Sequence, residues 1–500
     1  MSRSLSRLQI AGVGVAVVAL SAGCGLKSAQ LNSLKQAGVN PGVSNGIDSG
    51  GTLTPTTGGT TGTSTTGGSS TGGSGTTGSA TTGGSTTGGS STTGGTTTGG
   101  TTTGGTTGAT TGGTTGGTHA ACSAPSGGNT TGITSRGISI GVHAPQTGTG
   151  APLPPSFSKG VQVFWNQPSH KVCGRQVTVD FQDDKYTPAT AKAVCEPMSR
   201  RDFLIFGAAG TDQIQACATD PAMRGVPYLS AGVTDLGLTS LDNYFGVSLT
   251  YEQQGVLVLR NAESRGFAHP KGAGGKWAIV TGSSNNFDSA TKGIQDALKG
   301  AGVPFDTYRV NQTSDNGLQQ RAVSTGVTLA GKGYGTVFVT TSPGYFLYMT
   351  GGASKQGYNP HYTGPGVTMT EVTVAQLVCS GTAGLIKANF LAPFPGIDRA
   401  TADFKAATGG QYDDIYWALW GQAQLTFQML TNADDNLTRE NFIAKTLPAS
   451  FPAGAFAPVK FAGKHFGGTG VFSQVMDCNH TQPNQSQAGT WDTVGGRIDL

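Results

Sequence analysis

The chain has 500 residues, of which 82 are glycine and 12% are charged. Glycine is more than twice as frequent as the usual ~7%, yet no Gly-X-Y period runs through the chain, so composition excludes both a uniformly globular protein and collagen. The formal net charge of +4 is small and dispersed, which excludes a typical nucleic-acid-binding protein.

The first residues have the layout of a secretory signal. Two arginines precede an apolar stretch, residues 10–20, that is too short to span a bilayer, and small residues then lead to Cys24. A cysteine directly after Ala-Gly resembles the bacterial lipobox, although Ser21 stands where that pattern prefers Leu. We therefore predict a lipoprotein signal peptide over residues 1–23 and a lipid on Cys24. The lipid would anchor the protein in the cell envelope, on the outer face of the cytoplasmic membrane. An ordinary cleaved signal is the alternative.

Residues 24–121 are predicted to form a disordered tether. Their middle part repeats Thr, Gly and Ser in patterns such as TTGG and TTTGG, and residues 49–135 contain no Asp, Glu, Lys or Arg. With so few apolar side chains to bury, such a chain cannot offset the entropy cost of folding. The tether would hold a folded domain away from the membrane, and its many threonines could carry O-linked sugars.

From residue 136 onward, short apolar runs alternate with helical patterns. Such alternation is typical of βαβ units with parallel sheets, and two successive series predict two α/β lobes. Because ligands bind beyond the carboxyl ends of the strands in open α/β sheets, we expect the functional residues in the loops that follow the strands. The expected strands are 137–143, 176–181, 203–206, 226–230, 277–281, 304–310 and 336–340, and the expected helices are 156–165, 189–200, 212–223, 288–298, 318–330 and 345–356.

The cysteines predict disulfides rather than a metal site. Of seven cysteines, six remain once Cys24 is lipidated, and an even number in an exported chain favours disulfides. We favour Cys195–Cys217, because both residues fall in predicted helices that flank one strand. Cys122 and Cys173 precede the first two strands and are expected to pair, which leaves Cys379–Cys478. No pair has CxxC spacing and no histidine stands at metal-ligand spacing from them, so no metal is expected.

The order of these segments resembles the branched-chain amino-acid (Leu/Ile/Val) binding proteins of ABC importers. The resemblance implies the type 1 periplasmic binding fold, in which two lobes of parallel sheets flanked by helices are joined by three hinge crossovers and close on a ligand. The runs that carry it are Gly137–His143, Gly174–Asp184, the Ala-rich helix with Cys195, Asp202–Gly207 and Pro227–Gly232.

Three crossovers divide the expected lobes. We place them near Ser248–Tyr251, Ala388–Leu391 and Pro452–Val459. Lobe 1 then spans 122–250 plus about 389–455, and lobe 2 spans 251–388 plus about 456–500.

The same resemblance implies candidate ligand-binding residues in loops that follow strands. After the third strand, Thr211 and Asp212 would offer a hydroxyl and helix N–H groups to a ligand carboxylate, although Asp212 could equally be only a helix cap. The two aromatic candidates, Phe287 and Tyr345, could instead be core residues. The other candidates are Gln146 and Thr147 after the first strand, Ser230, Ala231 and Thr234 after the fourth, and Phe287, Tyr345 and Gly366 in the second lobe.

One departure from the family concerns the ligand. Amino-acid-binding members carry a Glu after a Gly-Pro pair to hold the ligand ammonium, whereas here Gly364-Pro365 is followed by Gly366, and Glu371 lies further along. This departure argues against α-amino recognition, and another small carboxylate, amide, urea-like or aromatic compound is the alternative. A long aromatic helix is expected over 412–429, with its start near the cleft by family analogy. Its residues 413–414 are interpreted as helix-start charges, and the tail after 479 as loop.

Motifs for an enzyme are weak. The run 137–141 matches G-x-S-x-G but lies inside a predicted strand, HExxH is absent, and the seven histidines are scattered. We therefore predict a non-enzymatic receptor without a cofactor. It would bind a small polar or carboxylated solute, an amino acid among the candidates, and deliver it to an ABC permease and ATPase complex. A sensor of the same fold that feeds a signalling partner, and a structural envelope lipoprotein without a ligand, are the alternatives.

Overall fold

The computed structural model describes residues 124–148, 156–231, 236–269, 275–366, 369–482 and 485–500, all of which belong to one compact unit. The predicted signal peptide and tether, with Cys24 and Cys122, and the candidate Thr234 lie outside these ranges. Within them, no helix combines the length and the apolar character that crossing a bilayer requires.

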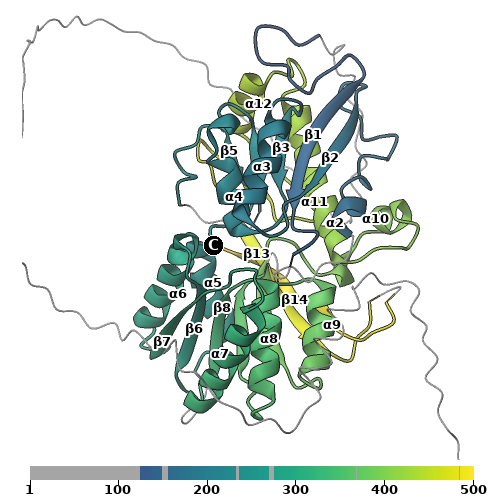
Figure 1. Ribbon diagram of the computed structural model, residues 1–500. Helices are drawn as coiled ribbons and strands as arrows, with labels where there is room; N and C mark the ends of the chain where they lie inside the picture. Colours follow the sequence, from purple (N-terminus) through teal and green to yellow (C-terminus); the bar gives the residue numbers. More distant parts are fainter. Residues whose placement is uncertain (1–123, 149–155, 232–235, 270–274, 367–368, 483–484) are drawn as a thin grey trace, which may run out of the picture. The chain divides into compact units, whose positions relative to one another are not determined.

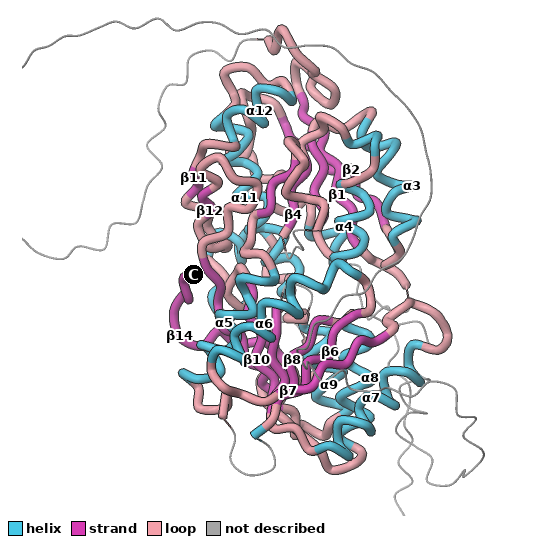
Figure 2. Tube along the Cα trace, turned by 90° about the vertical axis from the view of Figure 1, so that its left-hand side faces the viewer, coloured by secondary structure: helices cyan, strands magenta, loops and turns pink. Residues whose placement is uncertain are grey.

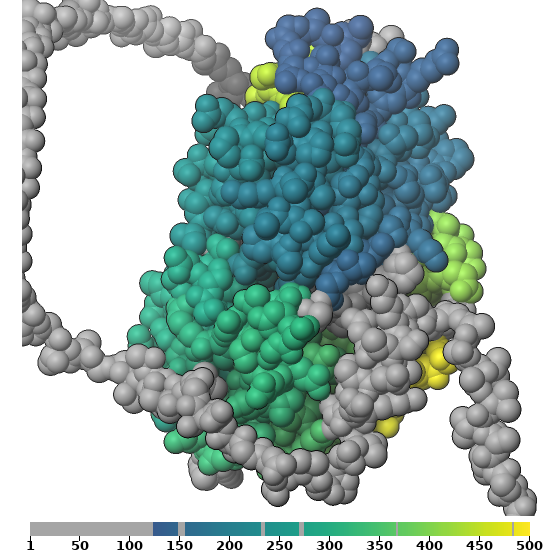
Figure 3. Space-filling view, in the orientation of Figure 1, coloured from purple at the N-terminus to yellow at the C-terminus, as the bar shows by residue number. Residues whose placement is uncertain are grey.

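Lobe 1 is built on a five-stranded sheet with the order β2-β1-β3-β4-β5, in which every neighbouring pair is parallel (Figure 1). Phe404 of α10 packs in the core of this lobe although it lies far along the sequence, and Figure 3 shows the α10 region (yellow-green) adjoining the blue surface of the first described residues. The strands are β1 (Gly137–Ala144), β2 (Gln176–Asp183), β3 (Leu204–Gly207), β4 (Tyr228–Ser230) and β5 (Tyr244–Gly246), with the hairpin β11 (Ser450–Phe451) and β12 (Val459–Lys460); the helices are α2 (Ser156–Gly160), α3 (Pro188–Ser199), α4 (Thr211–Ala218), α10 (Ala402–Ala407), α11 (Asp414–Asn432) and α12 (Arg439–Thr446), with short 3-10 turns at Pro221–Met223 and Ile397–Arg399.

Lobe 2 is built on a seven-stranded sheet with the order β14-β13-β10-β9-β8-β6-β7. Its five strands from β10 to β7 are parallel, whereas β13 and β14 are added antiparallel at one edge. The strands are β6 (Trp277–Gly282), β7 (Phe305–Val310), β8 (Thr336–Thr340), β9 (His361–Pro365), β10 (Lys387–Ala392), β13 (Gly470–Asp477) and β14 (Thr490–Asp499); the helices are α5 (Tyr251–Ser264), α6 (Asp288–Gly300), α7 (Leu318–Lys332), α8 (Pro343–Ser354) and α9 (Val372–Gly381), with a 3-10 turn at Asn285–Phe287.

Helices cover both faces of each sheet, because successive side chains of a buried strand point to opposite faces. In lobe 1, Leu204 and Phe206 of β3 pack on the side of α2, α11 and α12, whereas Ile205 packs on the side of α3 and α4. In lobe 2, Val337 and Val339 of β8 face α7, α8 and α9, whereas Phe338 faces α5 and α6, and Figure 2 shows these helices around the strands. The predicted fold class, with two parallel α/β sheets flanked by helices, is confirmed.

The chain crosses between the lobes three times. The first crossing, between β5 and α5, falls at the expected place, where Thr250 and Gln253 form a capping box that starts α5. The expected second crossover, Ala388–Leu391, is wrong, because this apolar run forms the buried strand β10 and the crossing follows it. The expected third crossover, Pro452–Val459, is also too early, because Phe461 still packs in the lobe 1 core and β13 begins only at Gly470.

Two predicted disulfides are present. Cys195 on α3 bonds to Cys217 on α4, and Cys379 on α9 bonds to Cys478 just after β13. Cys173 is also disulfide-bonded, and its predicted partner lies outside the described residues.

Candidate functional site

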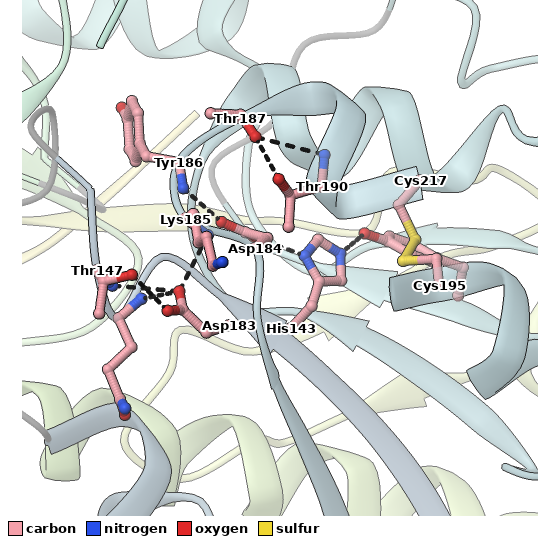
Figure 4. A network of polar contacts seen from close by, with 12 residues as sticks. His143, Thr147, Asp183, Asp184, Lys185, Tyr186, Thr187, Thr190, Cys195 and Cys217 are labelled. Carbon is pink, nitrogen blue, oxygen red and sulfur yellow. Dashed lines mark hydrogen bonds and ion pairs between the residues drawn. A yellow bond between two sulfur atoms is a disulfide. The ribbon is translucent and has the colours of Figure 1, made fainter. Parts of the chain in front are cut away.

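One carboxylate ties together the loops that follow β1 and β2 (Figure 4). Asp183 accepts hydrogen bonds from the backbone N–H groups of Gln146 (2.9 Å), Thr147 (3.1 Å) and Lys185 (2.9 Å), and from the Thr147 hydroxyl (2.6 Å). Burial acts to raise the pKa of Asp183, but these hydrogen bonds outweigh it and lower the pKa. The Gln146 side chain accepts in turn from the N–H of Ser158 on α2. Both candidates therefore hold the loop, and their contact with a ligand stays a prediction.

His143, near the end of β1, forms a fully buried network with Asp184 and Tyr228 (Figure 4). Its Nδ1 lies 2.8 Å from Asp184 and its Nε2 lies 2.7 Å from the Tyr228 hydroxyl. His143 also lies within 4.8 Å of the sulfurs of Cys195 and Cys217. Both sulfurs belong to one disulfide, so they offer no thiolate to a metal, and this group is a structural network.

The loop after β2 has an uncommon backbone conformation. Lys185 (φ 54°) and Tyr186 (φ 58°) are both left-handed, and their N–H groups donate to the two preceding aspartates. Strained backbone of this kind is concentrated at functional sites. Here Tyr186 lies close to Asp212 and Glu371. Burial first, and then the charges of these two residues, raise the pKa of Tyr186.

Thr211 and Asp212 link the two lobes. The Thr211 hydroxyl lies 2.9 Å from the Tyr251 hydroxyl on α5. Asp212 accepts hydrogen bonds from the Ser284 hydroxyl (2.9 Å) and from the Asn286 side-chain amide (2.7 Å), both in the loop after β6. The structure thus gives these two residues partners in lobe 2, and their expected contact with a ligand carboxylate is untested.

Replacing Asp212 with Ala is expected to loosen the contact between the lobes. The change removes two hydrogen bonds to a carboxylate, each worth about 1.5–3 kcal/mol when buried and less here because Asp212 is partly exposed. A loss of about 1.4 kcal/mol already shifts the balance of joined and separated lobes tenfold. Small-angle scattering should show a larger radius of gyration for Asp212→Ala than for the exposed control Asp242→Ala. Equal radii for the two variants would contradict the linking role.

The lobe 1 candidates after β4 are buried. The Ser230 hydroxyl lies 2.5 Å from the Tyr244 hydroxyl, and Ala231 is 1% exposed. The position of Thr234 is outside the described residues. Ser230 is therefore part of the lobe 1 core. A ligand that contacted the Ser230 hydroxyl would have to share it with the Tyr244 hydroxyl.

The lobe 2 candidates also lie in packed surroundings. Phe287 packs against Tyr251. Tyr345 is 1% exposed in the lobe 2 core, with its hydroxyl 2.7 Å from that of Thr325. Gly366 allows a close approach, because a Cβ there would lie 2.9 Å from Thr370. The alternative interpretation of the two aromatic residues, as core residues, therefore matches their burial.

A pocket lies between the lobes, at the carboxyl ends of strands from both sheets. It contains about 370 Å³ of space not filled by protein atoms, part of it open to solvent. Ala208 and Ala209 follow β3, Thr370 and Glu371 follow β9, and Phe394 follows β10, so both sheets contribute as the α/β rule requires. The remaining lining residues are Phe157 of α2 and Asp414, Ile415, Ala418, Leu419 and Gln422 of α11.

Two carboxyl groups, those of Glu371 and Asp414, line this pocket, and Asp413 precedes Asp414 in the chain. Asp413 caps α11 by accepting from the N–H of Tyr416 (3.1 Å), and it also accepts from the Ser156 hydroxyl. In contrast, Oε2 of Glu371 and both carboxylate oxygens of Asp414 are buried without a hydrogen-bond partner. Glu371 and Asp414 are 6% and 5% exposed.

The electrostatics of these carboxyls follow from burial and mutual repulsion. Burial first, and then the charges of Asp414 and Asp413, raise the pKa of Glu371 well above its usual value. Burial and the charge of Asp413 do the same for Asp414, while the nearby N–H of Val372 offsets part of the rise without reaching hydrogen-bond geometry. Burial also raises the pKa of Asp413, against the hydrogen bond from Ser156. Without a cation, the pocket favours protonated carboxyls.

The resemblance placed the start of the helix 412–429 near the cleft, and residues 414 and 415 do line the pocket, but none of the nine described candidate ligand-binding residues does. Asp413 was expected as a helix-start charge, which is confirmed by its capping bond, but Asp414 beside it is a buried pocket residue. In the sequence, Glu371 lies five residues after Gly366, beyond the position of the family's Glu. The N-terminus of α9 nevertheless brings Glu371 to the pocket. A signal was present in both cases: an acidic residue at the start of an apolar helix, which for Glu371 also follows directly after a strand and loop.

One family model matches most of the described part of the chain. The family model described as "Periplasmic binding protein" matches residues 137–477. A comparison with curated proteins finds no significant match.

Solved structures with the same fold come from several bacteria. A fatty acid ABC transporter substrate-binding protein from Thermomonospora curvata matches with a TM-score of 0.62 and 16% identity, over 74% of this chain and 95% of that chain. A solute-binding protein of an ABC transporter from Rhodopseudomonas palustris BisB5, in complex with 3,4-dihydroxybenzoic acid, matches with a TM-score of 0.56 and 15% identity, over 72% and 97%. A branched-chain amino acid transporter substrate-binding protein from Streptococcus pneumoniae, in complex with isoleucine, matches with a TM-score of 0.53 and 16% identity, over 72% and 100%.

Proposed function

Because this chain belongs to the periplasmic binding protein family, we propose that it is a lipid-anchored extracytoplasmic receptor that delivers a small solute to an ABC import permease and its ATPase. The observation that carries the proposal is the pocket between the lobes, lined at the strand ends of both sheets. A ligand that contacts both lobes binds the closed state better than the open one, and so shifts the population toward closure. The family is one of binding proteins rather than enzymes, and closure without chemistry is what such a site can do.

The proteins of similar fold support a small organic solute. Those named above are described with fatty acid, 3,4-dihydroxybenzoic acid and isoleucine, so one fold accepts chemically different ligands. The apolar part of this pocket, formed by residues such as Phe157, Phe394 and Leu419, suits the hydrocarbon part of such a solute. A sensor of the same fold is the second candidate, and it differs only in the partner that reads the closed state.

A ligand screen with a blocked pocket tests the proposal. The full chain is screened by thermal shift against amino acids, short organic acids, aromatic acids, amides and amines. A true ligand at a hundredfold excess over its Kd should stabilise the fold by about 2.7 kcal/mol. Ala418→Trp should abolish the shift, since Ala418 lines the pocket and indole fills it, while Ala402→Trp on exposed α10 should leave the shift intact.

The outcomes of this screen separate site from class. A ligand whose shift is the same with Ala418→Trp binds elsewhere, and the site assignment falls. Chemical turnover of the ligand by the purified protein would overturn the class of binding protein. Uptake of labelled ligand into cells distinguishes delivery to a permease from sensing. Cells that carry the wild-type chain should take up the ligand, and cells that carry the Ala418→Trp variant should not.

Changing Cys24 to Ser is expected to release the protein from the membrane. A lipid-modified Cys24 would be the anchor, since the described residues contain no helix able to cross a bilayer and the sequence beyond residue 24 has no long apolar run. Fractionation of cells should move the Cys24→Ser variant from the membrane pellet to the soluble fraction. Ser21→Leu, which restores the usual lipobox residue, serves as the control and should stay in the pellet. A Cys24→Ser variant that remains membrane-bound would refute the anchor.

A further inference from the structure

We propose that the solute carries a protonated nitrogen with N–H donors, which sits between Glu371 of lobe 2 and Asp414 of lobe 1 with its hydrocarbon part against α11. This inference deepens the proposed function and rests on it. It names the ligand class as small alkyl- or arylalkylamines and related N–H cations. The observations that carry it are the unpartnered buried oxygens, the charge balance of the pocket and its apolar wall.

The unpartnered oxygens define what the ligand must supply. Three carboxylate oxygens at the pocket lack a partner, namely Oε2 of Glu371 and Oδ1 and Oδ2 of Asp414. Leaving buried acceptors unpaired is costly, and a charged acceptor costs most. A primary ammonium has three N–H donors and no acceptor, so it matches this set in number and in sign. A quaternary ammonium matches the charge but has no N–H to donate.

The protein itself supplies too little positive charge. Among the residues that the structure describes, none of those that line the pocket is Lys, Arg or His. The starts of α9 and α11 lie beside the carboxyls, but a helix N-terminus carries only about half an elementary charge. Two such ends offset about one of the three carboxylates at most. The pocket is therefore complementary to a cation and repels an anion, unlike a site made for a free carboxylate.

An organic cation fits better than a metal ion. Among the described residues, the carboxylate oxygens of Glu371, Asp413 and Asp414 do not form a group within 4.8 Å of one another, as the ligands of a metal would. The pocket next to them has an apolar wall that a bare ion would leave unused. That wall consists of Phe157, Ala208, Ala209, Phe394, Ile415, Ala418 and Leu419.

The carboxyls also come from both lobes, which connects the ligand to closure. Glu371 belongs to lobe 2, because it directly precedes α9 and its carbonyl accepts from the Trp491 indole N–H on β14 (3.2 Å). Asp414 belongs to lobe 1, because it begins α11, whose Trp417 packs in the lobe 1 core. When both are ionised and no cation is present, these two groups repel each other across the lobes. A bound ammonium turns that repulsion into a bridge.

The test compares ligands of equal size and different head groups. Isothermal titration of the full chain at pH 8 uses n-butylamine, butyltrimethylammonium, 1-butanol and butyrate, with hexylamine and phenethylamine to vary the hydrocarbon. We expect the primary amines to bind at least tenfold more tightly than the other head groups. Binding should weaken from pH 8 to pH 5.5, because the amine stays charged while the carboxyls gain protons. Titration in two buffers of different ionisation enthalpy should show protons released from the carboxyls on binding.

Isosteric variants test the two carboxyls. Asp414→Asn and Glu371→Gln should each weaken amine binding at least tenfold, while Asp403→Asn, the same change at an exposed position on α10, should leave it unchanged. Both pocket variants remove a buried charge, so they should fold at least as stably as the wild type. If one of them fails to fold, the other variant and the pH series carry the test.

The results distinguish this inference from the proposed function. Butanol or butyrate binding as tightly as butylamine, or amine binding unchanged in both carboxyl variants, would overturn the cationic ligand. So would the failure of every primary amine to bind. A neutral or anionic solute whose binding is lost with Ala418→Trp would then leave the proposed receptor intact. Only a ligand that binds regardless of the blocked pocket, or that is chemically converted, removes both.

Discussion

Replacing Cys379 and Cys478 together with Ala is expected to lower the free energy of unfolding by about 4–5 kcal/mol. The disulfide closes a loop of 99 residues, and the loop-closure entropy that it removes from the unfolded chain corresponds to about 4.7 kcal/mol at that length. The bond also fixes α9 to the end of β13, the first of two antiparallel strands at the sheet edge. Urea denaturation at equilibrium measures the loss.

The second disulfide provides the matched comparison. Cys195 and Cys217 are only 22 residues apart, so the same relation gives about 3.4 kcal/mol for their replacement. The longer loop should therefore cost about 1.3 kcal/mol more. A reversed order, with the Cys195–Cys217 pair more costly, would show that packing of α3 against α4, and not chain entropy, dominates. Reductant breaks both bonds at once, so the wild type under reductant should lose more stability than either double variant.

Most of the fold could be predicted because local sequence and tertiary environment agree. The run Thr336–Thr340 is apolar and β-branched, and it is a fully buried strand between two layers of helices. The expected helix 318–330 corresponds to α7, Leu318–Lys332. Cys195 and Cys217 could be paired because parallel helices on one face of a sheet must lie side by side.

The edge of the second sheet could not be predicted in the same way. The tail after residue 479 was expected to be loop, yet Thr490–Asp499 forms β14. Only its first two residues are buried, and its exposed end includes two glycines, so the local pattern lacks the alternation of a core strand. Its partner β13 supplies the missing information, since antiparallel pairing decides the conformation.

For the site, too, local sequence patterns predict some features, whereas others depend on tertiary packing. Loops after the strands line the pocket, but the candidates Thr211 and Asp212 form hydrogen bonds between the lobes, and their contact with a ligand stays a prediction. A carboxylate at the start of a helix is normally a solvated cap, and Asp413 is a cap. That Asp414 is instead buried beside Glu371 depends on how α9 and α11 approach each other, and no spacing in the sequence encodes this.

The pH dependence of stability offers a measurement of the same carboxyls without any ligand. Glu371 and Asp414 are buried, and the pKa of each is raised in the folded protein, by burial first and then by neighbouring carboxylates. Unfolded, they titrate near their ordinary values of about 4. Below that pH both states are protonated and the groups have no effect. Above it the unfolded chain ionises first, so stability falls as the pH rises, until the pH exceeds the folded pKa values.

The double variant Glu371→Gln with Asp414→Asn should remove this decline. Each group contributes a slope of about 1.4 kcal/mol per pH unit in its window, so the double variant should become increasingly more stable than the wild type as the pH rises from 4. Other carboxyls with shifted pKa values, such as Asp183 and Asp306, are unchanged in the variant and cancel in the difference. Asp413, which remains, keeps its Ser156 partner. Urea denaturation of both proteins at each pH gives the difference.

The sign of that difference is decisive for the pocket. A variant that is more stable at pH 8 and equal at pH 4 means that the two carboxyls are uncompensated in the ligand-free protein, as their unpartnered oxygens indicate. A variant that is less stable at pH 8 would mean that a cation from the protein already pairs with them. In the wild type, saturating butylamine should reverse the fall of stability with rising pH. The bound ammonium favours the ionised carboxyls and therefore adds stability as the pH rises. The double variant, which cannot hold the ammonium, should show no such gain.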